Sequence, residues 1–203
     1  MVEIIVAFIT GILGPVIYLL VDKWWQLKKD KKRDKVKENF NDSHVIDNEL
    51  EEIRDFLQSD RVWIAQFHND GNFYPTGKSI QKFSIFYESL EPGVSLISTI
   101  FSNIPCSLYS KTFNHLLESD IGGVMIPDYD NAEVSGYGWR GSSEYTGNKS
   151  SYLIPMFSFE DKFIGVLGVD YVFKKKRLSK EEWDTLKKHS YKISGYLSNY
   201  LEK

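Results

Sequence analysis

His68 and Asp70 are the residues whose types and spacing come nearest to a reactive pair, because an imidazole and a carboxylate could bind a metal or exchange a proton. One histidine and one carboxylate nevertheless make an incomplete metal-ligand set. The remaining histidines, His44, His115 and His189, lie far apart and form no His-x-x-x-His pair. We therefore predict no metal site.

The lone cysteine, Cys106, excludes an internal disulfide and any metal site built from several thiolates. The sequence also lacks a Gly-rich phosphate loop, a Gly-x-Ser-x-Gly elbow and a His-Glu-x-x-His motif. These absences predict a protein that is not an enzyme.

A length of 203 residues suits one core-forming domain with an appendage. Hydrophobic residues make up 42% and aromatic residues 15%, which is enough to bury a real core. The net charge is -3, but residues 22–37 hold eight basic and three acidic residues. The positive charge is therefore concentrated near the N-terminus.

The segment from Ile4 to Val21 has no charged residue, and about 18 helical residues at 1.5 Å each span about 27 Å, close to the thickness of a membrane core. Trp24 and Trp25 follow it, as expected at headgroup depth, and then the basic residues. We predict a transmembrane anchor over residues 1–25, a basic juxtamembrane linker over 26–41, and a cytoplasmic domain over 42–203. The basic cluster could also attract anionic lipid.

Hydrophobic periodicity and turn residues predict the elements of this domain. The predicted strands cover residues 61–67, 82–87, 124–126, 151–159 and 162–173, and the helices cover 42–59, 110–117 and a long segment that starts at Ser179. Ser179 and Glu182 form a capping-box pattern, and residues 128–149 read as an exposed loop. This order predicts an α+β fold with an antiparallel sheet flanked by helices.

Two helical stripes could pair with a second copy of the chain. One runs from Ile46 to Leu57 and the other from Trp183 to Tyr200, both in steps of three and four residues. We therefore predict a possible homodimer through these helices.

Three phrases in the C-terminal half resemble a GAF domain. They are the strand from Ser150 to Met156, the strand from Phe163 to Asp170 that contains Ile-Gly-Val-Leu, and the helix start from Leu178 to Glu182. The resemblance covers residues 46–201 in element order and is loose over 94–149. It implies a GAF-like sheet with helices on one face and a small-molecule pocket on the other.

If this pocket exists, eight residues are expected to line it. They are Phe67, His68, Asn69, Phe83, Tyr87, Asp128, Tyr129 and Tyr152. Each aromatic residue could equally be ordinary core, because a small domain needs such residues for packing.

The resemblance also suggests ligands that this sequence supports poorly. Some GAF-related domains attach a bilin through a cysteine, but Cys106 lacks companion motifs and suits a structural role. Cyclic-nucleotide-binding GAF domains often show an Asn-Lys…Phe-x-x-x-Asp-Glu signature. Asn148-Lys149 and the segment from Phe157 to Asp161 imitate it, but Lys162 stands where the glutamate should be. We assign no cofactor, and the short basic run at residues 174–177 does not predict nucleic-acid binding.

The leading functional hypothesis is a membrane-anchored, non-enzymatic sensor whose GAF-like domain binds a ligand or partner and signals to a separate output protein. The alternative is a membrane-bound scaffold or docking protein that keeps the fold but binds no small molecule. An open cavity with convergent polar groups would favour sensing, and a closed aromatic-filled one would favour docking.

Overall fold

The computed structural model describes residues 14–32, 35–131 and 145–201, with side chains described outside residues 26–39 and 199–201. The chain divides into two compact units, Met1–Asn41 and Asp42–Lys203. All buried apolar residues of the two core clusters lie between Ile46 and Leu197. The second unit thus contains a complete core, and we expect it to fold on its own.

The described part of the first unit is helical. Helix α2 (Gly14–Lys32) exposes eight large apolar side chains, from Val16 to Val21 and at Trp24 and Trp25. The predicted membrane span starts at residue 4, and residues 4–13 lie outside the described ranges. Within those ranges, no helix combines the length and the apolar character that a membrane crossing requires. The predicted linker over 26–41 is helical wherever the structure describes it.

A six-stranded antiparallel sheet forms the centre of the second unit. Its strand order is β3-β2-β1-β6-β5-β4. The strands are β1 (Arg61–Asn72), β2 (Ser79–Leu90), β3 (Ile104–Pro105), β4 (Val124–Ile126), β5 (Ser150–Phe157) and β6 (Phe163–Tyr171). The five predicted strands are all present, whereas the two-residue β3 was not predicted.

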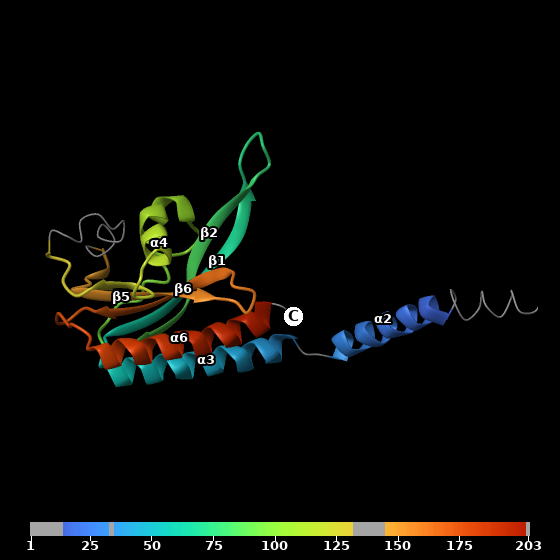
Figure 1. The fold of residues 1–203 in the computed structure, drawn as a ribbon, viewed down its shortest axis with the longest axis horizontal. Helices are drawn as coiled ribbons and strands as arrows, with labels where there is room; N and C mark the ends of the chain where they lie inside the picture. Colours follow the sequence, from blue (N-terminus) through green and yellow to red (C-terminus); the bar gives the residue numbers. More distant parts are fainter. Residues whose placement is uncertain (1–13, 33–34, 132–144, 202–203) are drawn as a thin grey trace, which may run out of the picture. The chain divides into compact units, whose positions relative to one another are not determined.

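Helices cover both faces of the sheet (Figure 1). Helices α3 (Lys35–Leu57) and α6 (Lys180–Leu201) lie side by side on one side, which we call the helix face. Helix α4 (Ser110–Leu117) and the short helix η2 (Cys106–Tyr109) lie on the other, which we call the α4 face. The predicted α+β fold with flanking helices is confirmed for this unit.

Strand alternation divides the core into two clusters, one on each face. In β1, Val62 and Ile64 pack against the helices, while Trp63 and Ala65 belong to the cluster under α4. Gly168 of β6 lies opposite Trp63, and a Cβ atom built on it would meet the indole at 2.1 Å. Only a glycine at this position lets the Trp63 indole pack this close to β6.

The two helical stripes are buried within the chain itself. The stripe of α3 is at most 2% exposed, as are Leu186, Ile193 and Leu197 of α6. Both stripes pack on the sheet in one cluster. The partner that these faces need is their own sheet, so a homodimer through these residues would have to open the core.

Local signals place the start of α6 correctly. The Ser179 N–H donates to Glu182 Oε2 at 2.7 Å, and the Glu182 N–H donates to Ser179 Oγ at 3.2 Å. This reciprocal pair satisfies backbone donors that the first helical turn leaves free.

The β1–β2 hairpin is longer than its sequence suggested. The predicted strands ended at residue 67 and began again at residue 82, but strand pairing continues to Asn72 opposite Ser79, and the loop lies at residues 73–78. The positive φ of Gly71, 78°, lies at a register irregularity inside the hairpin rather than at its turn. The hairpin consequently projects from its domain as an arm (Figure 1).

Candidate functional site

The α4 face contains a small cavity. Its volume is about 10 Å³, and its lining is apolar except for Thr112. The lining residues are Trp63, Ala65, Phe83, Thr112, Phe113, Leu116, Leu153 and Val166. The Thr112 hydroxyl is buried without a hydrogen-bonding partner in the described part of the chain. A space of this size holds at most one water molecule.

Aromatic rings close this side of the domain. Phe67 contacts Phe113 and Phe163 with ring centroids 5.3 Å and 4.6 Å apart, and Phe83 lies 5.4 Å from Phe113. These edge-to-face contacts stabilise the packing of the rings and join α4 to β1, β2 and β6. The predicted pocket residues Phe67 and Phe83 therefore do lie on the expected face, but they fill it.

Two predicted pocket residues lie on the opposite, helix face. Tyr87 pairs with Ile64 of β1, and a bulge in β2 leaves Phe86 unpaired. The bulge shifts the in-and-out alternation of β2 by one residue, so Tyr87 and Phe83 lie on opposite faces of the sheet. Tyr152 pairs with Val169 and packs in the helix-face cluster. The prediction that these tyrosines share a pocket with Phe67 and Phe83 is wrong.

The Tyr152 hydroxyl has a structural role. It donates to the carbonyl of Lys176 at 2.5 Å and accepts from the Leu178 N–H at 3.1 Å. Burial raises the pKa of Tyr152. These bonds hold the segment that leads into α6.

The remaining predicted residues are dispersed. His68 lies on the hairpin, where its Nε2 is 2.9 Å from Ser84 Oγ, and Asn69 is exposed beside it. Asp128 forms an ion pair with Lys175 at 2.7 Å, and this bond lowers the pKa of Asp128. Only Tyr129 joins Phe67 and Phe83 in the α4-face cluster.

A buried polar centre lies on the same face and was not predicted. Arg61 Nη1 lies 3.1 Å from Asp170 Oδ2, and both side chains are at most 1% exposed. Trp63 Nε1 donates to the same oxygen at 2.9 Å, and Ser151 Oγ donates to Asp170 Oδ1 at 2.5 Å. Burial raises the pKa of Asp170, and the Arg61 charge and the three donors oppose that rise.

Arg61 also ties the centre to loops around it. It donates to Asn148 Oδ1 and to the Ser95 carbonyl, each at 3.0 Å. The Tyr129 hydroxyl is buried nearby, and burial and the Asp170 charge raise its pKa. The centre brings together residues up to 109 positions apart, so no local sequence signal could have identified it.

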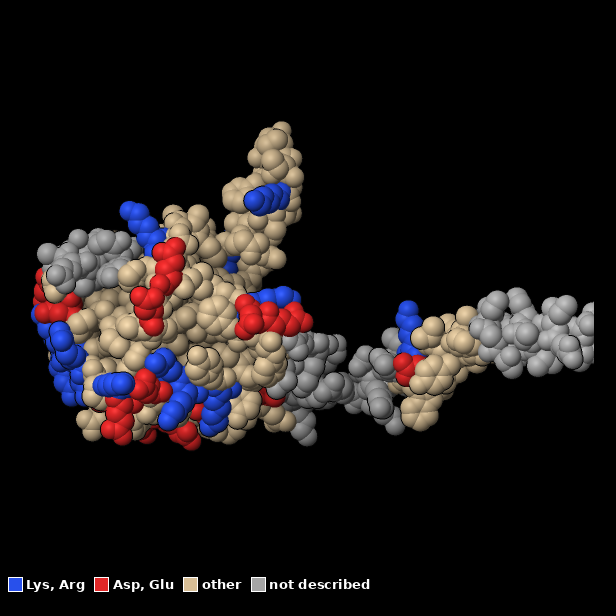
Figure 2. Space-filling view, in the orientation of Figure 1, with Lys and Arg blue, Asp and Glu red and all other residues tan. Residues whose placement is uncertain are grey.

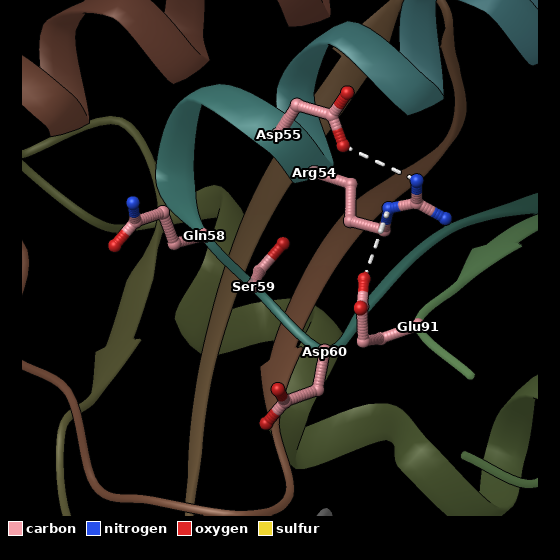
Figure 3. A pocket seen from close by; sticks show the side chains of 6 residues that line it. All are labelled: Arg54, Asp55, Gln58, Ser59, Asp60 and Glu91. Atoms are coloured by element: carbon pink, nitrogen blue, oxygen red, sulfur yellow. Dashed lines mark hydrogen bonds and ion pairs between the residues drawn. The ribbon is translucent and has the colours of Figure 1, made fainter. Parts of the chain in front are cut away.

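A larger, open groove lies where α3 ends (Figure 3). Its volume is about 410 Å³, and six polar residues line it: Arg54, Asp55, Gln58, Ser59, Asp60 and Glu91. Arg54 Nη2 is 3.2 Å from Asp55 Oδ1, and its Nε is 3.8 Å from Glu91 Oε2. None of these residues had been predicted to form a site.

One group of side chains has metal-like spacing. Ligand atoms of Glu49, Glu52 and His189 lie within 4.8 Å of one another between α3 and α6. Glu49 is 3% exposed and already contacts His189 Nδ1 at 2.5 Å and the ammonium of Lys192. The positive charge of Lys192 disfavours a second cation at this place.

The projecting hairpin presents aromatic side chains to solvent. Tyr74 is 97% exposed and Phe73 is 53% exposed. The Phe73 N–H donates to the Lys78 carbonyl and the Gly77 N–H donates to the Phe73 carbonyl, each at 2.8 Å. In Figure 2 the arm carries few charged side chains. Its tip is thus an ordered apolar surface.

Comparison with solved structures identifies the fold. The GAF domain of PixJ from Thermosynechococcus elongatus, in its blue-light-absorbing form, aligns with a TM-score of 0.62 and 17% identity over 84% of this chain and 94% of that one. A phycocyanobilin-bound GAF domain from a cyanobacterial phytochrome aligns with a TM-score of 0.61 and 18% identity over 82% and 90%. The resemblance to a GAF domain is therefore confirmed for the fold. No protein-family model and no curated protein sequence matches the chain.

The α4 face does not fit a tetrapyrrole. A cavity of about 10 Å³ is far smaller than the 300–1,000 Å³ or so typical of small-molecule pockets. Cys106 is partly buried against the aromatic cluster, and burial raises the pKa of its thiol, which lowers the fraction present as the reactive thiolate. We derive no bilin chemistry for this chain.

Proposed function

We propose that this chain is a non-enzymatic sensory or signalling module that recognises a ligand or partner through its GAF-like domain. The observation that carries the proposal is the α4 face, where a GAF-type sheet encloses an apolar cavity with one unpartnered hydroxyl, that of Thr112. A buried donor without a partner is a costly feature that a small ligand with an acceptor would satisfy. Because the cavity as it stands holds at most one water molecule, α4 has to move to admit such a ligand.

A thermal-shift screen of residues 42–203 against small aromatic and heterocyclic metabolites tests this proposal. A ligand at a hundred times its dissociation constant stabilises the domain by about 2.7 kcal/mol. Thr112→Val provides the matched variant, since it replaces the orphan hydroxyl with a methyl group of similar size.

The two readouts of Thr112→Val separate ligand binding from stability. We expect the free domain to gain about 1 kcal/mol of unfolding free energy and the ligand to bind more weakly. Thr76→Val, on the exposed hairpin loop, is the control and should leave ligand affinity unchanged. A hit with equal affinity for wild type and Thr112→Val would place the ligand elsewhere and contradict the proposal.

We also propose that residues 1–25 anchor the domain to a membrane, with the domain on the cytoplasmic side and a separate protein as its output. The exposed apolar side chains of α2 between Val16 and Trp25 support the anchor, because water disfavours such a surface. Fractionation of cells that express the full chain tests it. Recovery in the soluble fraction after high-salt washing would contradict the anchor, while a variant lacking residues 1–25 controls for the domain.

A docking protein without a small ligand is the second candidate, and two observations favour it. The cavity is very small and partly lined by aromatic rings, and the hairpin displays Phe73 and Tyr74 on a hydrogen-bonded loop. Rigid exposed aromatics are typical anchors of protein interfaces. A flat ligand screen, together with partner binding that Tyr74→Ser abolishes without changing the melting temperature, would favour this candidate.

A further inference from the structure

We propose that the groove at the end of α3 binds an organic cation, that is, an ammonium or guanidinium group. This site is separate from the α4-face cavity and does not depend on the ligand proposed there. The groove opens to solvent among the last turn of α3, the start of β1 and the end of β2 (Figure 3).

The charge of the lining selects a cation. Three carboxylates, of Asp55, Asp60 and Glu91, line the groove together with a single positive side chain, that of Arg54. The groove also lies at the C-terminal end of α3, which is the negative end of the helix dipole. Both contributions attract positive charge and disfavour a phosphate or a carboxylate.

Arg54 shows which chemistry the groove accepts. Its guanidinium lies between Asp55 and Glu91, and Nη1 donates to the Leu90 carbonyl at 2.6 Å (Figure 3). Asp55 and Glu91 remain 73% and 50% exposed, so each keeps an open side toward the groove. A second guanidinium, or an ammonium group, could therefore bind the carboxylate oxygens that Arg54 leaves accessible.

An orphan hydroxyl provides the independent sign of a ligand. Ser59 is 3% exposed and lines the groove, and its Oγ has no hydrogen-bonding partner within the described ranges. The neighbouring Asp60 carboxylate is fixed, because its Oδ2 accepts the Val172 and Phe173 N–H groups at 2.6 Å and 2.9 Å. The unsatisfied Ser59 hydroxyl lies in the same lining as the Asp55 and Glu91 carboxylates (Figure 3), and such a set of oxygens is suited to accept N–H donors from a bound amine.

The test is a titration of isotope-labelled residues 42–203 with agmatine, which carries both cationic groups, followed by amide NMR. We expect shifts concentrated at residues 54–60 and 91. Glu91→Gln and Ser59→Ala should each weaken agmatine about fivefold, as expected for the loss of about 1 kcal/mol. Glu160→Gln, which removes an exposed acid on the β5–β6 turn, is the matched control and should have no effect.

Ser59→Ala separates binding from folding. Because the hydroxyl has no partner in the free protein, its removal should leave the melting temperature unchanged or raised while agmatine affinity falls. A structural role would lower both. Shifts spread evenly over the acidic surface, or affinities unaffected by both groove variants, would overturn the proposal.

A second titration with an acetylated Arg-Lys peptide amide identifies the source of the cation. Tighter binding of the peptide than of agmatine, with the same residues shifting, assigns the groove to a basic segment of a partner. Tighter binding of agmatine assigns it to a free amine.

Discussion

Replacing Asp170 with asparagine is the most direct test of the buried polar centre. The substitution keeps the size of the side chain and removes its charge, so Arg61 remains buried without a counter-ion. The new amide group also faces a donor, either Trp63 Nε1 or Ser151 Oγ, where the wild type offers a carboxylate oxygen. Both changes destabilise the folded state.

The cost follows from these contacts. Removing one partner of a buried ion pair costs about 3–5 kcal/mol, because the remaining charge is not solvated. A domain of this size has a total stability of about 5–15 kcal/mol, so this is a large share of it. With a urea m-value of about 2 kcal/mol/M, a loss of about 4 kcal/mol moves the unfolding midpoint down by about 2 M.

Urea unfolding of residues 42–203, followed by tryptophan fluorescence, measures this difference. Asp130→Asn is the control, since Asp130 is 84% exposed and its change should stay within about 0.5 kcal/mol. If Asp170→Asn does not fold, Ser151→Ala removes a single donor and should cost about 1–2 kcal/mol. A loss below 1 kcal/mol for Asp170→Asn, with a native spectrum, would refute the role assigned to this centre.

Two further predictions concern packing and pH. Gly168→Ala should destabilise the domain by several kcal/mol in the same urea assay, because its Cβ would meet Trp63 at 2.1 Å. Gly195→Ala, whose nearest contact is 3.7 Å, should instead stabilise α6 by about 0.5–1 kcal/mol. Equal effects of the two substitutions would contradict the packing argument. The backbone bond from Ser179 lowers the pKa of Glu182 below its ordinary value of 4.5, so its stabilisation is complete above that pH and is lost as the pH falls through the lowered pKa. Glu182→Gln should therefore cost about 0.5 kcal/mol at pH 7, and melting temperatures across pH 2–7 should converge with wild type in acid.

The sequence predicted the elements whose signals are local. The capping box at Ser179 and Glu182 placed the start of α6 within one residue, because both groups of the pair lie within one helical turn. The β5–β6 hairpin and α4 followed in the same way from turn residues and apolar spacing. The resemblance to a GAF domain also placed Phe67 and Phe83 on the face opposite the two long helices, where they lie.

The features that the sequence left undetermined depend on information that is not local. The side on which Tyr87 lies depends on a bulge at Phe86, which is set by pairing between β1 and β2. The stripes of α3 and α6 satisfy a helix-pairing pattern equally well against a second chain or against a sheet. The groove around Ser59 combines the last turn of α3, the segment between α3 and β1, and the residue after β2, and no spacing in the sequence predicts that these meet.

The polar centre also connects the two faces of the sheet. Asp170 points to the α4 face, and the next residue, Tyr171, points to the helix face and donates its hydroxyl to the Leu57 carbonyl at 2.9 Å. Asp60, in the groove, donates its N–H to the Asp170 carbonyl at 3.1 Å. Since these groups belong to consecutive backbone positions, a displacement of β6 has to move the end of α3 and the groove with it.

Hydrogen exchange can measure this connection. In Asp170→Asn, which changes no residue of the groove, the amides of residues 57–60 should exchange faster, and agmatine should bind more weakly. Exchange at residues 110–117 of α4 serves as the reference for general loosening of the fold. If residues 57–60 keep wild-type rates while α4 loosens, the polar centre stabilises only its own face and the two sites are independent.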